Sequence, residues 1–197
     1  MVEVRNEVIL ASLVFAIAVI VSATLPPEVR DMASIEVERT VRPFEEAFSV
    51  KPFETLIALP VIILYNNFRV AVINIALGPT IVVPIAITAF NGFYITSFVM
   101  SGNVIENSLL IIPHGVVEIP AFILSAAIGL KLGFAVILRG LRLRDVSLAE
   151  VLALCIRYLS IVLMLFAIAA LIETFLTPSI YAAYKVLTSS SLGGSVG

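Results

Sequence analysis

The chain has 197 residues, of which 60% are hydrophobic and only 13% are charged. Soluble domains usually carry about 45–50% apolar and about 25% charged residues, so this composition indicates an integral membrane protein. The formal net charge is −2 and no basic run is present, which argues against a nucleic-acid partner, and the single cysteine excludes an intrachain disulfide. Glutamine is absent while valine and isoleucine abound, which favours a thermophilic source.

The first apolar segment, residues 8–25, is long enough to cross a bilayer core as a helix. It follows MVEVRNE, which lacks the basic start of a signal peptide and therefore favours a retained helix. In residues 27–50, apolar side chains recur every fourth residue from Val29 to Val41, and charged ones fall mostly on other faces. This pattern predicts an extracytoplasmic amphipathic helix, either a cap on the bundle or a docking surface for a partner.

The second predicted span, residues 55–78, has a polar middle that is costly in lipid and should face the protein interior. Three polar residues lie there: Asn66, Asn67 and Arg69. A very short Gly-Pro turn leads to the third predicted span, residues 80–100, which carries the pair Asn91 and Gly92.

The fourth predicted span, residues 109–130, contains the only histidine of the chain, His114. Glu118 follows one helical turn later, so both side chains leave the same face of a helix. Proline and glycine residues around this pair would kink the helix or let a neighbouring helix approach closely. They are Pro113, Gly115, Pro120 and, further along, Gly129.

The fifth predicted span, residues 148–176, carries Arg157 and Glu173 and is long enough to tilt or to protrude from the bilayer. The sequence Thr-Pro at 177–178 is expected to end it. Residues 1–188 are thus predicted to form one transmembrane domain, and residues 189–197 a flexible tail. The predicted fold is all-α, a polytopic membrane bundle of about five transmembrane helices plus the outer amphipathic helix.

The distribution of charge in the loops predicts the orientation of the chain. Residues 131–145 carry four basic residues against one aspartate, whereas residues 26–54 carry four basic residues against seven acidic ones. Because basic loops stay in the cytoplasm, the N-terminus and the loop at 131–147 are expected inside. The loop at 26–54 and the C-terminus are then expected outside.

The polar residues of the spans fall at similar depths when each residue adds 1.5 Å along a helix. Charges near the midplane cost a few kcal/mol each and are rarely unpaired, so Glu118 should pair with Arg69 or Arg157. We predict a Glu118–Arg69 ion pair completed by the neighbouring asparagines. The expected intramembrane network comprises Asn66, Asn67, Arg69, Asn91, His114, Glu118, Arg157 and Glu173.

No pattern of a catalytic centre accompanies this network. A zinc protease of the HExxH type needs two histidines, and no G-x-S-x-G elbow or glycine-rich phosphate loop occurs. The sequence therefore predicts no enzyme, no catalytic residue, no metal and no cofactor.

Four segments together resemble the stage II sporulation protein M family of integral membrane proteins. They are YNNFRVAVINIALG (65–78), FNGFYITS (90–97), IIPHGVVEIPAFILSAAIGLKLG (111–133) and LIETFLTP (171–178). In spore-forming bacteria the family's name protein is a membrane-embedded member of a complex with cell-wall-degrading enzymes during engulfment. For this chain the resemblance implies a multi-pass membrane protein and no more specific role. Relatives occur in organisms that do not sporulate. No catalytic role comes with the residues of the motif: Asn66, Asn67, Asn91, Gly92, Pro113, His114, Gly115, Glu118, Pro120, Glu173 and Pro178.

Two functions remain open from the sequence. The first is a non-enzymatic membrane scaffold or complex subunit, whose partners are the lipid bilayer and either a second copy or an unidentified membrane or extracytoplasmic protein. The alternative is an oligomeric channel or transporter, or a permease-like subunit. It would move ions, protons or a small solute past the polar midplane site.

Overall fold

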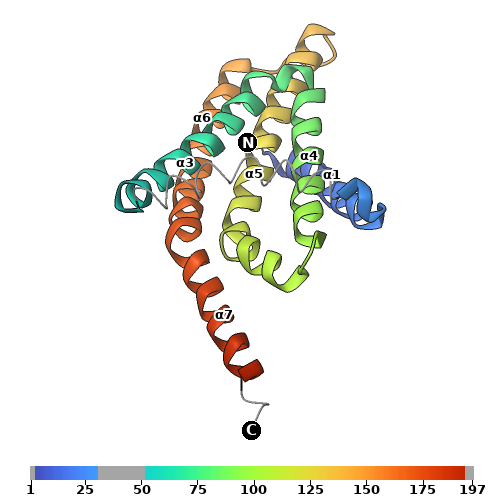
Figure 1. Ribbon diagram of the computed structural model, residues 1–197. Coiled ribbons are helices and arrows are strands. Elements are labelled where there is room, and N and C mark those ends of the chain that lie inside the picture. The colour runs from blue at the N-terminus through green and yellow to red at the C-terminus, as the bar shows by residue number, and fades with distance from the viewer. Residues whose placement is uncertain (1–2, 31–51, 194–197) are drawn as a thin grey trace.

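A computed structural model describes residues 3–30 and 52–193, and every regular element in this part of the chain is a helix (Figure 1). The elements are α1 (Arg5–Thr24), α3 (Pro52–Ala76), η1 (Gly78–Thr80), α4 (Val82–Met100), α5 (Val104–Gly140), α6 (Leu148–Leu171), η2 (Ile172–Leu176) and α7 (Thr177–Gly193). Within the described residues, five helical segments are long and apolar enough to cross a membrane. The predicted all-α multi-pass fold is confirmed. The predicted amphipathic helix at 27–50 lies mostly outside the described residues.

Two spans are longer than predicted. Helix α5 has 37 residues and continues to Gly140, so Lys131 lies inside a helix and not in a loop. The fifth span does not stop at residues 177–178, because α6 runs through η2 into α7. Pro178 clashes in a helix with the carbonyl four residues before it. That residue, Thr174, lies in η2, a π-helical turn whose wider ladder accommodates the ring. Residues 189–193, predicted as part of a flexible tail, belong to α7.

Helix α5 is the centre of the molecule, and α1, α3, α4, α6 and α7 all contact it (Figure 1). Its side chains enter each of the three apolar clusters that form the core, with Ile128, Ala121 and Ala126 among them. Pro113 and Pro120 lie within α5 without ending it. Figure 1 shows the first turns of α5 lying across the molecule before the helix turns into the bundle, the kind of bend that proline causes.

Glycines let α5 meet the end of α3 backbone to backbone. A Cβ atom on Gly129 would collide with the main-chain carbonyl of Asn74, and one on Gly133 with that of Gly78. The Asn74 side chain is fully buried beside this contact, and its Nδ2 donates to Ser125 Oγ at 3.0 Å. Gly129 thus lies at a backbone-to-backbone contact, as expected for a small residue at a helix interface.

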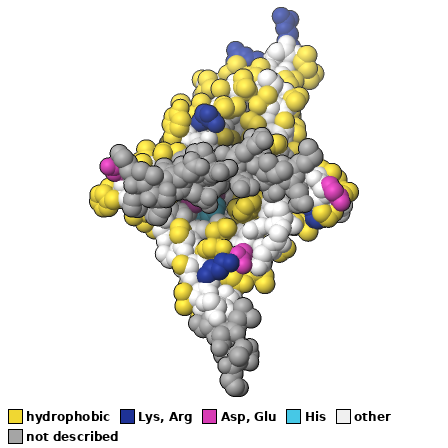
Figure 2. Space-filling view, in the orientation of Figure 1, with side chains coloured by type: hydrophobic (Ala, Val, Ile, Leu, Met, Phe, Trp, Pro, Cys, Tyr) yellow, Lys and Arg dark blue, Asp and Glu magenta, His cyan; other side chains and the backbone are white. Residues whose placement is uncertain are grey.

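Helix α1 is fixed by a glycine contact with α4 and by an ion pair with α5. A Cβ atom on Gly92 would lie 2.8 Å from the Phe15 carbonyl oxygen, so Gly92 also has a packing role. At the other end of α1, Lys131 Nζ lies 3.2 Å from Glu7 Oε1. Figure 2 shows apolar side chains over most of the described surface in view, with Lys and Arg gathered near the junction of α5 and α6.

The glycine contact predicts a position-specific loss of stability. Gly129→Ala should lower the free energy of unfolding by about 1–3 kcal/mol, because the added methyl overpacks a backbone contact. Gly115→Ala is the matched control, since its Cβ would have no neighbour closer than 3.5 Å. Titration of the purified protein with a denaturing detergent measures both, and equal losses would contradict the packing role.

The ion pair between α1 and α5 predicts a rescue. Lys131→Met should destabilise the protein by about 3 kcal/mol, since it leaves the buried Glu7 carboxylate without its cation. Adding Glu7→Gln should recover most of that loss. Thermal unfolding in detergent checks this, with Arg144→Met at an exposed position as the control. A double variant as unstable as the single one would disprove the pair's role.

Candidate functional site

One imidazole and two carboxyl groups converge inside the bundle. His114 and Glu118 come from α5, and Glu173 comes from η2. One nitrogen or oxygen atom from each lies within 4.8 Å of the others, and His114 Nε2 is 3.7 Å from Glu118 Oε2. We refer to His114, Glu118 and Glu173 as the acid–imidazole cluster.

The local structure of two elements directs these side chains toward one another. His114 and Glu118 are one helical turn apart and so share the face of α5 that meets the fifth span. Glu173 lies in the π-helical turn between α6 and α7, and turns of this kind occur often at functional sites. Just after it, the buried Thr177 places Oγ1 3.4 Å from His114 Nδ1. The imidazole therefore has a hydrogen-bond partner at Nδ1, while Nε2 faces the Glu118 carboxyl beyond hydrogen-bond distance.

The cluster contains no cationic side chain. Two ion pairs join described Lys residues to described carboxylates, and neither includes Glu118 or Glu173. They are Lys131 with Glu7 and Lys185 with Glu106. Neither Glu118 nor Glu173 has a described Lys or Arg within ion-pair distance. Two ionised carboxylates about 5 Å apart repel by about 3 kcal/mol at an effective dielectric constant near 20. A proton or a bound cation is needed to balance the charge.

Asn67 of α3 borders the cluster. Its amide is near enough to act on the Glu118 carboxyl, but Nδ2 is buried and makes no hydrogen bond of ordinary geometry. The Glu118 side chain keeps 26% of its surface exposed, so the cluster is open on that side. An unpaired buried donor costs free energy, and the Glu118 carboxyl is the nearby acceptor that this amide could meet after a small side-chain movement.

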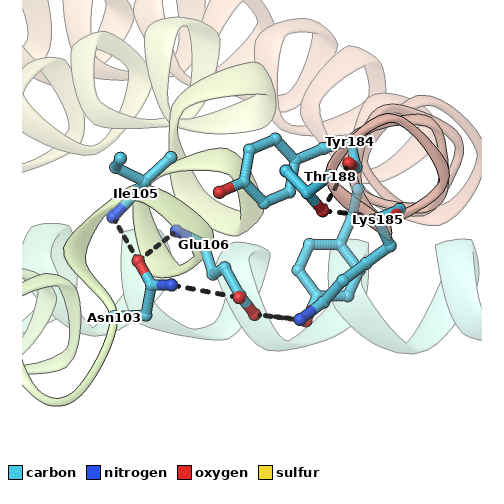
Figure 3. Close-up of polar contacts among 7 residues, drawn as sticks. Asn103, Ile105, Glu106, Tyr184, Lys185 and Thr188 are labelled. Atoms are coloured by element: carbon cyan, nitrogen blue, oxygen red, sulfur yellow. Dashed lines mark hydrogen bonds and ion pairs between the residues drawn. The ribbon is translucent and has the colours of Figure 1, made fainter. Parts of the chain in front are cut away.

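A second polar contact fixes α7 against the start of α5 (Figure 3). Glu106 Oε2 lies 2.7 Å from Lys185 Nζ and accepts a hydrogen bond from the Tyr181 hydroxyl at 2.8 Å. Asn103 caps α5 by accepting from the Glu106 amide, and its Nδ2 donates to Glu106 Oε1 at 3.0 Å. Because α7 continues from η2, this contact helps hold Glu173 and Thr177 opposite His114.

Comparison with known proteins shows the family to which this chain belongs. The model of the family described as Stage II sporulation protein M matches residues 8–178, a range that includes the whole acid–imidazole cluster. The chain belongs to the stage II sporulation protein M family. A similar curated protein, Uncharacterized protein MJ0793 of Methanocaldococcus jannaschii, is 34% identical over 125 residues, which cover 60% of this chain and 70% of that protein. No solved structure matches the chain.

In this family member, the predicted Glu118–Arg69 ion pair is wrong. Arg69 is exposed on α3, and its Nη2 donates to Asn66 Oδ1 on the same helix at 3.2 Å. Arg157 is exposed on α6 and does not pair with Glu118 either. The sequence placed Arg69, Arg157 and Glu118 at similar depths in the bilayer. The depth of a residue along its helix does not determine the direction in which its side chain points.

Some of the other residues predicted for the network lie beside Glu118, and others lie apart from it. Asn91 donates from Nδ2 to the Ile87 carbonyl of its own helix at 2.9 Å and does not join Glu118. Asn66 serves Arg69, as described above. Only Asn67 and Glu173 lie beside His114 and Glu118. The predicted network of eight residues is thus replaced by a compact inward cluster and separate outward polar groups.

Sequence reasoning did not single out Thr177 or Glu106. Thr177 was read only as a helix end, because the following proline concealed the continuation of the helix. Glu106 follows Asn103 by three residues, and that spacing is typical of a capping box. It identifies the start of α5 from the sequence, although the contacts with Tyr181 and Lys185 depend on the tertiary structure.

The cluster predicts a pattern of energetic coupling. In chelator-treated protein, Glu118→Gln and Glu173→Gln should each raise the unfolding midpoint, since either change relieves the repulsion between the carboxylates. A double-mutant cycle should give a coupling of about 1–3 kcal/mol for this contacting pair. The cycle for Glu118 and Arg69 should instead be additive within about 0.5 kcal/mol. Strong coupling to Arg69 and none to Glu173 would contradict the structure.

Proposed function

We propose that this chain is a non-enzymatic subunit of a larger membrane assembly and acts as a scaffold for a partner transmembrane segment. The observation that carries the proposal is the exposure of Arg69 and Arg157 on the surfaces of two apolar membrane-spanning helices. A charged side chain inside the bilayer costs about 2.5–3.5 kcal/mol when lipid is its only neighbour. A partner that supplies an acceptor removes this cost.

The surface around Arg69 is shaped for a helix. Exposed side chains recur every fourth residue along α3 and lead to Arg69: Phe53, Ile57, Val61 and Tyr65. A hollow of about 490 Å³ lies beside this stripe and is lined by Phe53, Ile57, Val61 and their neighbours. Helices pack by inserting ridges of side chains into such grooves. We call this stripe, with Arg69, the α3 face.

The partner we infer is a different protein with a carboxylate or a free carbonyl at the depth of Arg69. Among the described residues of this chain, the exposed acidic side chains are Glu3, Glu28, Glu54, Asp145 and Glu150, all at or near helix ends or in loops. A second copy therefore offers no described, exposed carboxylate in mid-span. Membership of a complex is also what the family resemblance implies. The proposal also includes the orientation predicted from the loop charges, in which the N-terminus and residues 131–147 lie on the cytoplasmic side of the membrane.

Site-specific photocrosslinking in native membranes tests the proposal. A photoreactive amino acid at Ile57 or Tyr65 should form an adduct with one partner protein, whereas one at Ile17 of α1 should not. Arg69→Ala should reduce the Tyr65 adduct at least about tenfold, the effect of losing 1.4 kcal/mol or more of binding. Substituting the partner's acidic residue should have the same effect.

Three outcomes would overturn this docking role. The adduct could survive Arg69→Ala unchanged, it could contain lipid alone, or it could join two differently tagged copies of this chain. The last result would assign the α3 face to self-association.

The alternative function is an oligomeric channel or transporter. The observation that favours it is the acid–imidazole cluster, which lies beside a π-helical turn and has no Lys or Arg partner among the described residues. The transport function predicts a cation or proton flux across the membrane of proteoliposomes, and Glu118→Gln should abolish this flux. The scaffold proposal predicts no flux above that of empty liposomes. A flux that is lost in Glu118→Gln but kept in Glu150→Gln, at an exposed position of α6, would replace the scaffold proposal by transport.

A further inference from the structure

We propose that the acid–imidazole cluster is a binding site for a divalent first-row transition metal ion, with His114, Glu118 and Glu173 as ligands. Neither the family match nor the similar protein assigns such a site. The proposal is independent of the scaffold role, because it concerns the interior of the bundle and not the α3 face.

The spacing of the three groups fits a metal site. Metal–nitrogen and metal–oxygen bonds to Zn²⁺ are about 2.0–2.2 Å, so neighbouring ligand atoms in a tetrahedral site lie about 3.4 Å apart. His114 Nε2 and Glu118 Oε2 are 3.7 Å apart, and the Glu173 oxygen joins them within 4.8 Å. A bound ion would therefore need to draw the three ligand atoms closer together by about 1.4 Å or less, a shift within the range of side-chain rotation.

The surroundings of His114 prepare one ring nitrogen for a metal. A metal-binding histidine usually donates its other ring N–H to a neighbouring acceptor, which sets the tautomer and the ring orientation. Thr177 Oγ1 lies 3.4 Å from Nδ1 and is suited to this role, which leaves the Nε2 lone pair directed toward Glu118. In that tautomer two acceptor atoms face each other, and a cation between them makes the contact favourable.

The charge and the composition of the site indicate which ion it takes. Two carboxylates with no Lys or Arg among their described neighbours supply the charge that a dication needs. One imidazole with two carboxylates suits Zn²⁺, Mn²⁺ or Fe²⁺, whereas Mg²⁺ and Ca²⁺ prefer oxygen ligands alone. With three protein ligands, one position is left for water or another group, on the open side at Glu118.

Zinc binding to the purified full-length protein in nanodiscs tests the site. After chelator treatment, titration with Zn²⁺ followed by gel filtration and elemental analysis should give one retained ion per chain. Glu118→Gln and Glu173→Gln should each weaken binding at least about 100-fold, and Thr177→Val about tenfold, the range found for partners of metal ligands. Glu150→Gln, at an exposed position in the first turn of α6, is the control and should bind as the unmodified protein does.

Co²⁺ gives a second readout that does not depend on stability. Its visible absorption bands should appear in the unmodified protein and in Glu150→Gln, and should be absent in Glu118→Gln and Glu173→Gln, with gel filtration confirming that each variant is folded. The proposal is overturned if the unmodified protein retains no stoichiometric zinc. It is equally overturned if the double variant Glu118→Gln/Glu173→Gln retains as much zinc, which would make the ion adventitious.

Discussion

The close contact of α5 with the end of α3 is the constraint on which the rest of the structure depends. Gly129 meets the backbone of Asn74 in α3, and Gly133 meets that of Gly78 in η1 directly after it, with no room for a side chain at either place. The hydrogen bond from Asn74 to Ser125 is buried beside these contacts. In a bilayer this kind of van der Waals contact replaces the hydrophobic effect as the main attraction between helices. Because α5 is fixed in this way and contacts all the other spans, its rotation decides where His114 and Glu118 point.

The structure separates the intramembrane polar groups into two sets with different physical roles. The acid–imidazole cluster faces inward, has two carboxyl groups without a described Lys or Arg beside them, and is suited to a cation. Arg69 and Arg157 face outward, carry positive charge, and are suited to acceptors from another molecule. A single network would have cancelled these charges inside the monomer. Their separation leaves both sets available for binding.

The sequence predicted the spans well, because runs of apolar residues long enough to cross a bilayer occur in few other settings. It also predicted that His114 and Glu118 share a helix face and that a neighbouring helix approaches closely at Gly129. It did not predict the π-helical turn at Glu173, which departs from the regular helical period by one residue. The pairing of Glu118 failed for a related reason. Depth follows from sequence position, but the rotation of each helix about its axis depends on packing, which one sequence does not display.

The central claim is that His114, Glu118 and Glu173 converge on one point. The zinc K-edge X-ray absorption spectrum of the zinc-loaded protein tests this claim most directly. We predict a first shell of nitrogen and oxygen near 2.0–2.1 Å with the signature of one imidazole, which should disappear in His114→Ala. The single cysteine, Cys155, is not part of the cluster: it is buried on α6, and its Sγ donates to the Ile128 carbonyl of α5. A sulfur shell near 2.3 Å, or a shell of oxygen alone, would contradict the account.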